Sequence, residues 1–488
     1  RYIVLRSLRL RSCSDLGPYL SAKWPIFRFR WPSTNRVLFI LASLGLLVQL
    51  ADNFLGREES FFDNIGPPVT GLLVFSSMTL ISVLIQVRLI HESKVFSRIE
   101  TGKSFFSRTL LRLPLFLQYL LVAILILLLI EIFATSGYHV FVIKVATSTS
   151  LSASAVILGV LSSRFAYALK HSRGRVVGAY MMASGALAIY NTFTLLYILS
   201  FLQNKPDFIT ADYNPGLFMS VAVPPSLFVI YQLLGVISFV SMWFASIFLT
   251  DQFAFRSRRI WYWIVMSLPF LYFIGPFLMY SFEDTEPIMQ FRKEYSTLYA
   301  DIYNLLLNTS KVGGIILFGI VFLLLSKTIP NPRLKSSVIM TGIGLVFLYG
   351  INVSSLVILS MYPPWGILSI TYLLSGSYLL MIGLDSAAFF VATDSSLRRI
   401  VQKSPERYLD IVKSLGQSKV QDLVMKKING ISKSVYDEIE HDNLFRVTFE
   451  EDNIQNYVMQ VLEELHQKNV NLSSDQYKRD RKEDPKDW

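Results

Sequence analysis

The chain has 488 residues, 52% of them hydrophobic and only 17% charged, whereas a soluble chain carries about 25% charged residues. The composition therefore predicts an integral membrane protein. The net charge of +11 belongs to residues 1–393, because the part from Asp394 onward holds 16 Lys/Arg and 18 Asp/Glu; this leaves no basic soluble domain that would bind nucleic acid.

Residues 1–35 form a basic segment that Pro18, Pro25 and Pro32 interrupt. No cleavable signal peptide is recognisable in it, and because the sequence starts with Arg1 we expect that the N-terminus is trimmed, truncated or misassigned. Cys13 is the single cysteine of the sequence, which excludes a disulfide within one chain.

Residues 36–393 contain ten apolar segments that are long enough to cross a hydrocarbon core of roughly 30 Å. We expect helices, because a helix satisfies its own backbone hydrogen bonds in lipid and these runs are too long for barrel strands. The predicted spans are 36–52, 69–90, 113–134, 143–163, 177–201, 224–250, 260–280, 311–329, 337–361 and 365–391.

The loops between these spans alternate in charge. Of the 30 Lys/Arg residues before Asp394, 24 fall on one set of loops and six on the other, and the second set carries most of the acidic residues. Since basic loops stay in the cytoplasm, the sequence predicts an all-α polytopic membrane protein of about ten helices, with both termini cytoplasmic and in the cell (plasma) membrane. Anionic headgroups are the expected partners of the basic loops.

Residues 177–259 and 337–399 could be an internal repeat. Pro224-Pro225 and Pro363-Pro364 each open a long apolar stretch that ends in a pair of arginines followed by isoleucine. Internal repeats are common in transporters. The simpler interpretation is that proline suits the first turn of any helix.

Ionisable residues within predicted spans are candidate functional residues, because charge is costly in a bilayer. Glu131 and Lys144 lie near the outer ends of neighbouring spans and could form an ion pair that clamps the two helices, or serve a substrate or proton. Asp385 lies in the last span without an obvious basic partner. It is either a protonated or hydrogen-bonded structural carboxyl or a proton- or cation-binding site.

Two further features allow a structural and a functional interpretation. The hydroxyl-rich run 147–154 either packs helices together or lines a polar cavity. The outward segment 283–309 carries Tyr295, Tyr299 and Tyr303 at helical spacing. These tyrosines either anchor an interfacial helix or form an outer ligand-binding face.

Residues 394–468 are predicted to form a cytoplasmic region of short amphipathic helices, and 469–488 a disordered tail. The pairs Glu438/His441 and Glu463/His466 lack the further glutamates of a di-iron bundle. We therefore predict no metal, no cofactor and no catalytic residues.

These observations favour a non-enzymatic membrane protein: a sensor, scaffold or complex subunit that couples the helix bundle to the cytoplasmic region, to which a protein partner could bind. The alternative is a small-molecule or ion-coupled permease. A water-accessible cavity that reaches Asp385 or the run 147–154 would favour the permease, and a closed bundle would favour the sensor or scaffold.

Overall fold

The fold is a bundle of long helices, seen in a computed structural model. The structure describes residues 33–55, 69–99, 105–210, 224–254, 317–349, 362–401 and 411–424, with gaps of one or two residues in several of these ranges, together with parts of 260–274. Within these residues six helices are long and apolar enough to cross a membrane, and Val37–Asp52 and Leu317–Lys327 are shorter apolar helices. The chain is therefore an all-α membrane protein with several spans.

The first half of the bundle consists of α2, Ser33–Leu55, α4, Val69–Ile99, α5, Phe105–Thr135, α6, Val140–Ser172, and α7, Arg175–Gln203. The second half consists of α8, Pro225–Ala254, α12, Pro332–Tyr349, and α14, Ile367–Thr393. Each of these helices covers most or all of one predicted span, and several continue beyond it. Because α4 and α6 extend to Ile99 and Ser172, basic residues that the sequence assigned to loops lie within helices.

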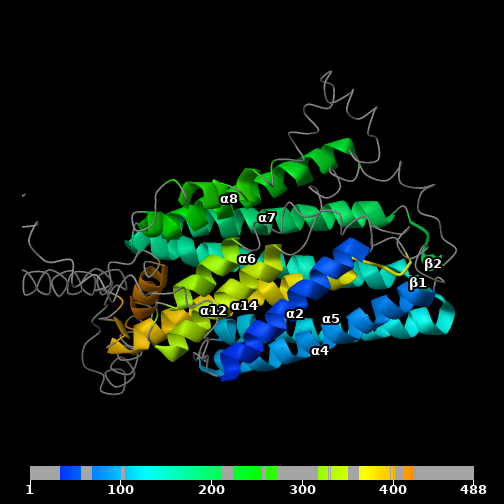
Figure 1. Cartoon of the computed structure of the whole chain (residues 1–488), viewed down its shortest axis with the longest axis horizontal. Coiled ribbons are helices and arrows are strands. Elements are labelled where there is room, and N and C mark those ends of the chain that lie inside the picture. Colours follow the sequence, from blue (N-terminus) through cyan, green and yellow to red (C-terminus); the bar gives the residue numbers. More distant parts are fainter. Residues whose placement is uncertain are drawn as a thin grey trace, which may run out of the picture.

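A short antiparallel sheet, which the sequence did not predict, joins two of the connections. Strand β1, Gly137–His139, pairs with β2, Phe208–Thr210, so that Tyr138 lies opposite Ile209. Figure 1 shows both strands at one end of the bundle, which we call the strand end. Residues 411–421 lie at the opposite end, the tail end.

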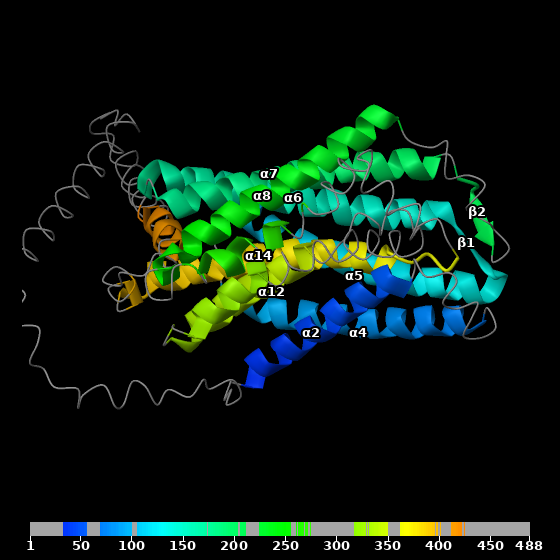
Figure 2. The ribbon, with the colours of Figure 1, turned by 45° about the horizontal axis from the view of Figure 1, so that its top comes forward.

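Helix α14 lies at the centre of the bundle, between α12, α6 and α4 (Figures 1 and 2). Its whole membrane-spanning window is buried, as expected for a helix that is apolar on all sides and surrounded by other helices. By contrast, α5 exposes Leu113, Phe116, Ile130 and Phe133. Such side chains face lipid when the bundle lies in a membrane.

Glycines allow α12 and α14 to cross at short distance. A Cβ atom added to Gly344 would lie 2.5 Å from the backbone nitrogen of Leu380, and one added to Gly376 would lie 2.9 Å from the carbonyl oxygen of Gly344. Small residues bring helix backbones close together in membranes, where packing drives association. This crossing holds α14 in the middle of the bundle.

Candidate functional site

The main candidate site is an ion pair between the central helix and α6. The guanidinium of Arg164 donates a hydrogen bond to the carboxylate of Asp385, whose side chain is 10% exposed. The prediction that Asp385 has no obvious basic partner was wrong. Arg164 was assigned to a loop, but α6 continues to Ser172 and places Arg164 inside the bundle.

The partner reduces the cost of burying the Asp385 carboxylate. A buried charge without a partner costs several kcal/mol, whereas a hydrogen-bonded pair costs much less. The Arg164 side chain is 31% exposed, so its charge is only partly removed from solvent. Asp385 lies eight residues before the end of α14, or about 12 Å at 1.5 Å per residue.

The chain beyond α14 packs back on the tail end of the bundle. The side chain of Arg398 donates hydrogen bonds to the carbonyl oxygens of Val391 and Ala392, where the negative end of the helix dipole favours a cation. In the segment 411–421, Ile411 and Val412 are buried. A Cβ atom added to Gly416 would lie 2.8 Å from Cγ1 of Val391, so Gly416 lets this segment approach α14 closely.

A small cavity remains beneath this contact. Its volume is about 10 Å³, and its walls are formed by residues from α12, α14, the helix Leu317–Lys327 and the segment 411–421, together with Ile329. The lining residues are Phe322, Leu325, Ile329, Val338, Thr341, Leu384, Ala387, Ile411 and Val412. A space of this size and apolar character holds at most one water molecule.

The predicted Glu131–Lys144 pair is replaced by a contact between Glu131 and His139. One carboxylate oxygen of Glu131 accepts hydrogen bonds from the backbone nitrogen of His139, at 2.8 Å, and from its imidazole Nδ1. The physical reason is proximity, because β1 places His139 beside the last turn of α5. Lys144 lies one turn inside α6.

Lys205 is a second charged residue at the strand end. Its Nζ lies 4.8 Å from the centre of the Phe201 ring, at a distance that gives a cation–π attraction. Burial lowers the pKa of this ammonium group, because desolvation disfavours the charged form. The sequence analysis had placed Lys205 in an outward loop and assigned it no contact.

The hydroxyl-rich run 147–154 connects helices. Ser150 donates a hydrogen bond to the carbonyl oxygen of Ile370 on α14, at 2.6 Å, and Ser154 accepts one from Asn191 on α7, at 3.0 Å. Thr147, Ser150 and Ser154 are all buried. Of the two interpretations of this run, the contacts of Ser150 and Ser154 match helix packing, whereas the Thr147 hydroxyl donates to carbonyl oxygens of its own helix.

Several predicted features lie outside the described residues: Tyr295, Tyr299 and Tyr303, and the pairs Glu438/His441 and Glu463/His466. Within the part of the chain that the structure describes, no group of three or more His, Cys, Asp or Glu side chains could hold a metal ion.

Arg164 and Asp52 are among the charged residues whose environment sequence reasoning missed. Arg164 lies one residue beyond the predicted span 143–163, and Asp52, the last residue of the span 36–52, was grouped with the acidic outward loop that follows it. The available signal was helix continuity: no proline or glycine ends α6 before Ser172 or α2 before Leu55. Asp52 is fully buried.

The fold and the ion pair define a class, that of all-α multi-pass membrane proteins with a charged contact to a central helix. Comparison with known protein families, with curated proteins and with solved structures gives no match.

Proposed function

We propose that the chain is a non-enzymatic protein of the plasma membrane, a sensor, scaffold or complex subunit that couples its helix bundle to its cytoplasmic region. In this proposal ten helices span the membrane, both termini are cytoplasmic, and the tail end faces the cytoplasm. The loop charges support this orientation.

The observation that carries the proposal is the packing of the segment 411–421 against the last turns of α14. Helix α14 contacts α12, α6 and α4 along its length, and its last turn packs against Gly416. A displacement of α14 would therefore change the surface on which this segment rests, as a sensor requires. The same segment would carry a change in the cytoplasmic region back to the bundle.

The permease is a second candidate, and the Asp385–Arg164 pair is the feature that favours it. Ionisable residues within membrane spans often mark proton or ion pathways. Against it, Asp385 is only 7% exposed, and the cavity beside Leu384 and Ala387 is small and apolar.

In this proposal, anionic lipid headgroups bind the basic residues at the tail end of the bundle. Arg175, Arg333 and Lys335 lie in the first turns of α7 and α12, where they would meet the cytoplasmic leaflet. Each such residue near an anionic surface contributes about 1 kcal/mol. A protein partner would bind the cytoplasmic region.

The accessibility of introduced cysteine thiols to a water-soluble reagent distinguishes a closed bundle from a permease. Single cysteines replace Ser150 and Ser377, both buried, in a Cys13→Ser background. A membrane-impermeant maleimide is then added to inside-out or right-side-out vesicles. We expect no labelling of Ser150→Cys or Ser377→Cys from either side. Labelling of either from any side would contradict the proposal and support a water-filled pathway.

Two control positions calibrate this experiment. Ser395, which is exposed just beyond α14, should be labelled from the cytoplasmic side after substitution by cysteine. Val156 is 61% exposed on α6 and should face lipid, so Val156→Cys should stay unlabelled by the impermeant reagent. Labelling of Ser395→Cys from the opposite side would contradict the proposed orientation.

A further inference from the structure

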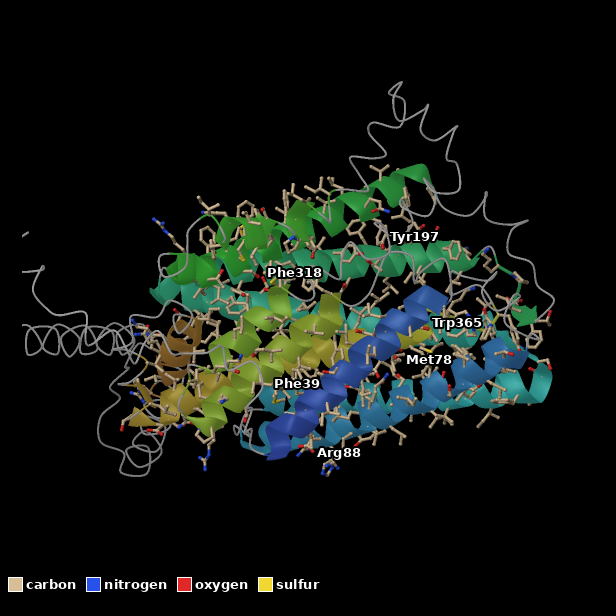
Figure 3. All side chains as sticks on the ribbon, viewed as in Figure 1. Phe39, Met78, Arg88, Tyr197, Phe318 and Trp365 are labelled. Carbon is tan, nitrogen blue, oxygen red and sulfur yellow. The ribbon has the colours of Figure 1, made fainter. Side chains whose placement is uncertain are left out.

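A buried carboxylate, that of Asp52 on α2, lies at the amino end of α14. It accepts hydrogen bonds from the backbone nitrogens of Gly366 and Ser369 and from the Ser369 hydroxyl, each at 2.9 Å. Figure 3 shows the neighbouring Trp365 beside the carboxyl end of α2. Asp52 therefore caps the amino end of α14 from another helix.

The described groups that surround this carboxylate are neutral. No basic side chain within the described ranges forms an ion pair with Asp52. The part of α4 that packs at this end of the bundle, residues 69–78, contains no titratable side chain. Its Phe75 contacts Trp365 instead, with ring centres 5.2 Å apart. From α4, the carboxylate therefore meets an apolar surface.

The titratable residues that α12 and α14 bring near this end are tyrosines. Tyr372 of α14 faces α2, because a Cβ atom added to Gly45 would lie 3.5 Å from its Cε1, and the charge of Asp52 acts on its hydroxyl. Tyr349 at the end of α12 and Tyr362 before α14 are the others among the described residues. A tyrosine hydroxyl is neutral at physiological pH, so these residues supply no positive charge.

The helix cap balances the negative charge only in part. The amino end of a helix supplies about half an elementary charge, and Asp52 is 0% exposed, so water does not solvate it. A proton on Oδ1 removes the charge and weakens the bond from Gly366, whereas Oδ2 can still accept both bonds from Ser369. Burying an ionised carboxylate costs more than losing one hydrogen bond. The protonated form therefore fits this site better than the ionised form.

We propose that the Asp52 carboxylate is a proton-binding site that controls how firmly α2 is held to the central helix α14. The protonated acid keeps α2 docked, and the ionised form loosens the contact because water stabilises its charge better than this site does. Since the folded protein then binds the proton more tightly than the unfolded chain, its stability rises as the pH falls. This site does not depend on the proposed function of the chain.

Infrared difference spectra of the purified full-length protein in detergent test proton binding directly. The pH is lowered from about 8 to about 5, and the carbonyl band of protonated carboxyl groups is followed. We expect Asp52→Asn to lose the part of this band that belongs to one carboxyl group. Asp207→Asn is the matched control, because it removes an exposed strand-end carboxylate and should keep that part. The unfolding temperature of the wild type should rise over the same pH change more than that of Asp52→Asn.

Ser369→Ala gives a second test that keeps the proposal falsifiable if Asp52→Asn fails to fold. It removes the hydroxyl that donates to Oδ2 and keeps the backbone nitrogen that does the same. Because a hydrogen bond to the charged form favours that form, its loss should move the protonation of Asp52 to higher pH.

Three results would overturn the proposal. An identical pH-dependent band in the wild type and in Asp52→Asn would show that Asp52 exchanges no proton over this range and is a structural cap only. An identical pH dependence of their unfolding temperatures would show that the proton does not hold α2. A titration that Ser369→Ala leaves unchanged would show that the hydroxyl does not stabilise an ionised Asp52.

Discussion

Three carboxylates of the described residues each have a specific partner. Asp385 is paired with Arg164, Glu131 with His139, and Asp52 with the amino end of α14. Asp385 is a candidate functional residue by its position in the sequence and by its ion pair in the structure. Its pairing with Arg164 leads to a prediction about single and double substitutions.

We expect Arg164→Ala to destabilise the protein by about 2–4 kcal/mol, because it leaves the buried Asp385 carboxylate without its partner. Asp385→Asn in the same chain should recover most of this loss, since the neutral amide needs no counter-charge. Thermal unfolding of the single and double variants in detergent measures the coupling.

The control for this cycle is Arg88→Ala. Arg88 pairs with Glu92 at 3.2 Å, but its side chain is 54% exposed, and exposed pairs contribute little. If the stability loss of the double variant equals the sum of the losses of the two single variants, Arg164 and Asp385 do not stabilise one another.

At the scale of elements, α12 and α14 cross at short distance in the centre of the bundle. Gly376 packs against the carbonyl oxygen of Gly344, the nitrogen of Leu348 and the Cβ atom of Phe347, at 2.9–3.0 Å from an added Cβ. Backbone atoms cannot move aside as a side-chain end can. A larger residue at this position must separate the two helices.

Gly376→Val should therefore lower the unfolding temperature strongly, with a loss of roughly 1–3 kcal/mol or more from overpacking. The matched control is Gly159→Val on α6, because an added Cβ meets no atom within 4 Å there. Equal stability of the two variants, measured by thermal unfolding in the same detergent, would contradict the close crossing.

At the scale of the whole molecule, the segment 411–421 packs against the tail end of the bundle. Its contact with α14 depends on Gly416, which lies against Val391, and buries Ile411 and Val412. The segment contributes to the core of the bundle from the side that is opposite to the strands (Figure 1).

Gly416→Leu should release this segment without unfolding the bundle. Amide hydrogen exchange of residues 411–421 should rise at least tenfold, because the new side chain clashes with Val391, while exchange within α14 stays slow. Lys413→Ala, which changes a charged residue of the same segment, serves as the control. Slow exchange of 411–421 in Gly416→Leu would show that docking does not depend on this contact.

The sequence by itself determined the helical membrane class and the approximate position of the helices, because apolar runs of about 20 residues have few other stable structures in lipid. It also identified Asp385 and Glu131 as charged residues in costly positions. The internal repeat and the full number of spans stay predictions.

Only the tertiary structure decided which charges meet. Arg164 and Asp385 are 221 positions apart in the chain, and Asp52 and Gly366 are 314 apart, so no local pattern links them. The approach of α6 and α2 to α14 brings these groups together, because hydrophobic length specifies that a helix spans a membrane but not which neighbour it packs against.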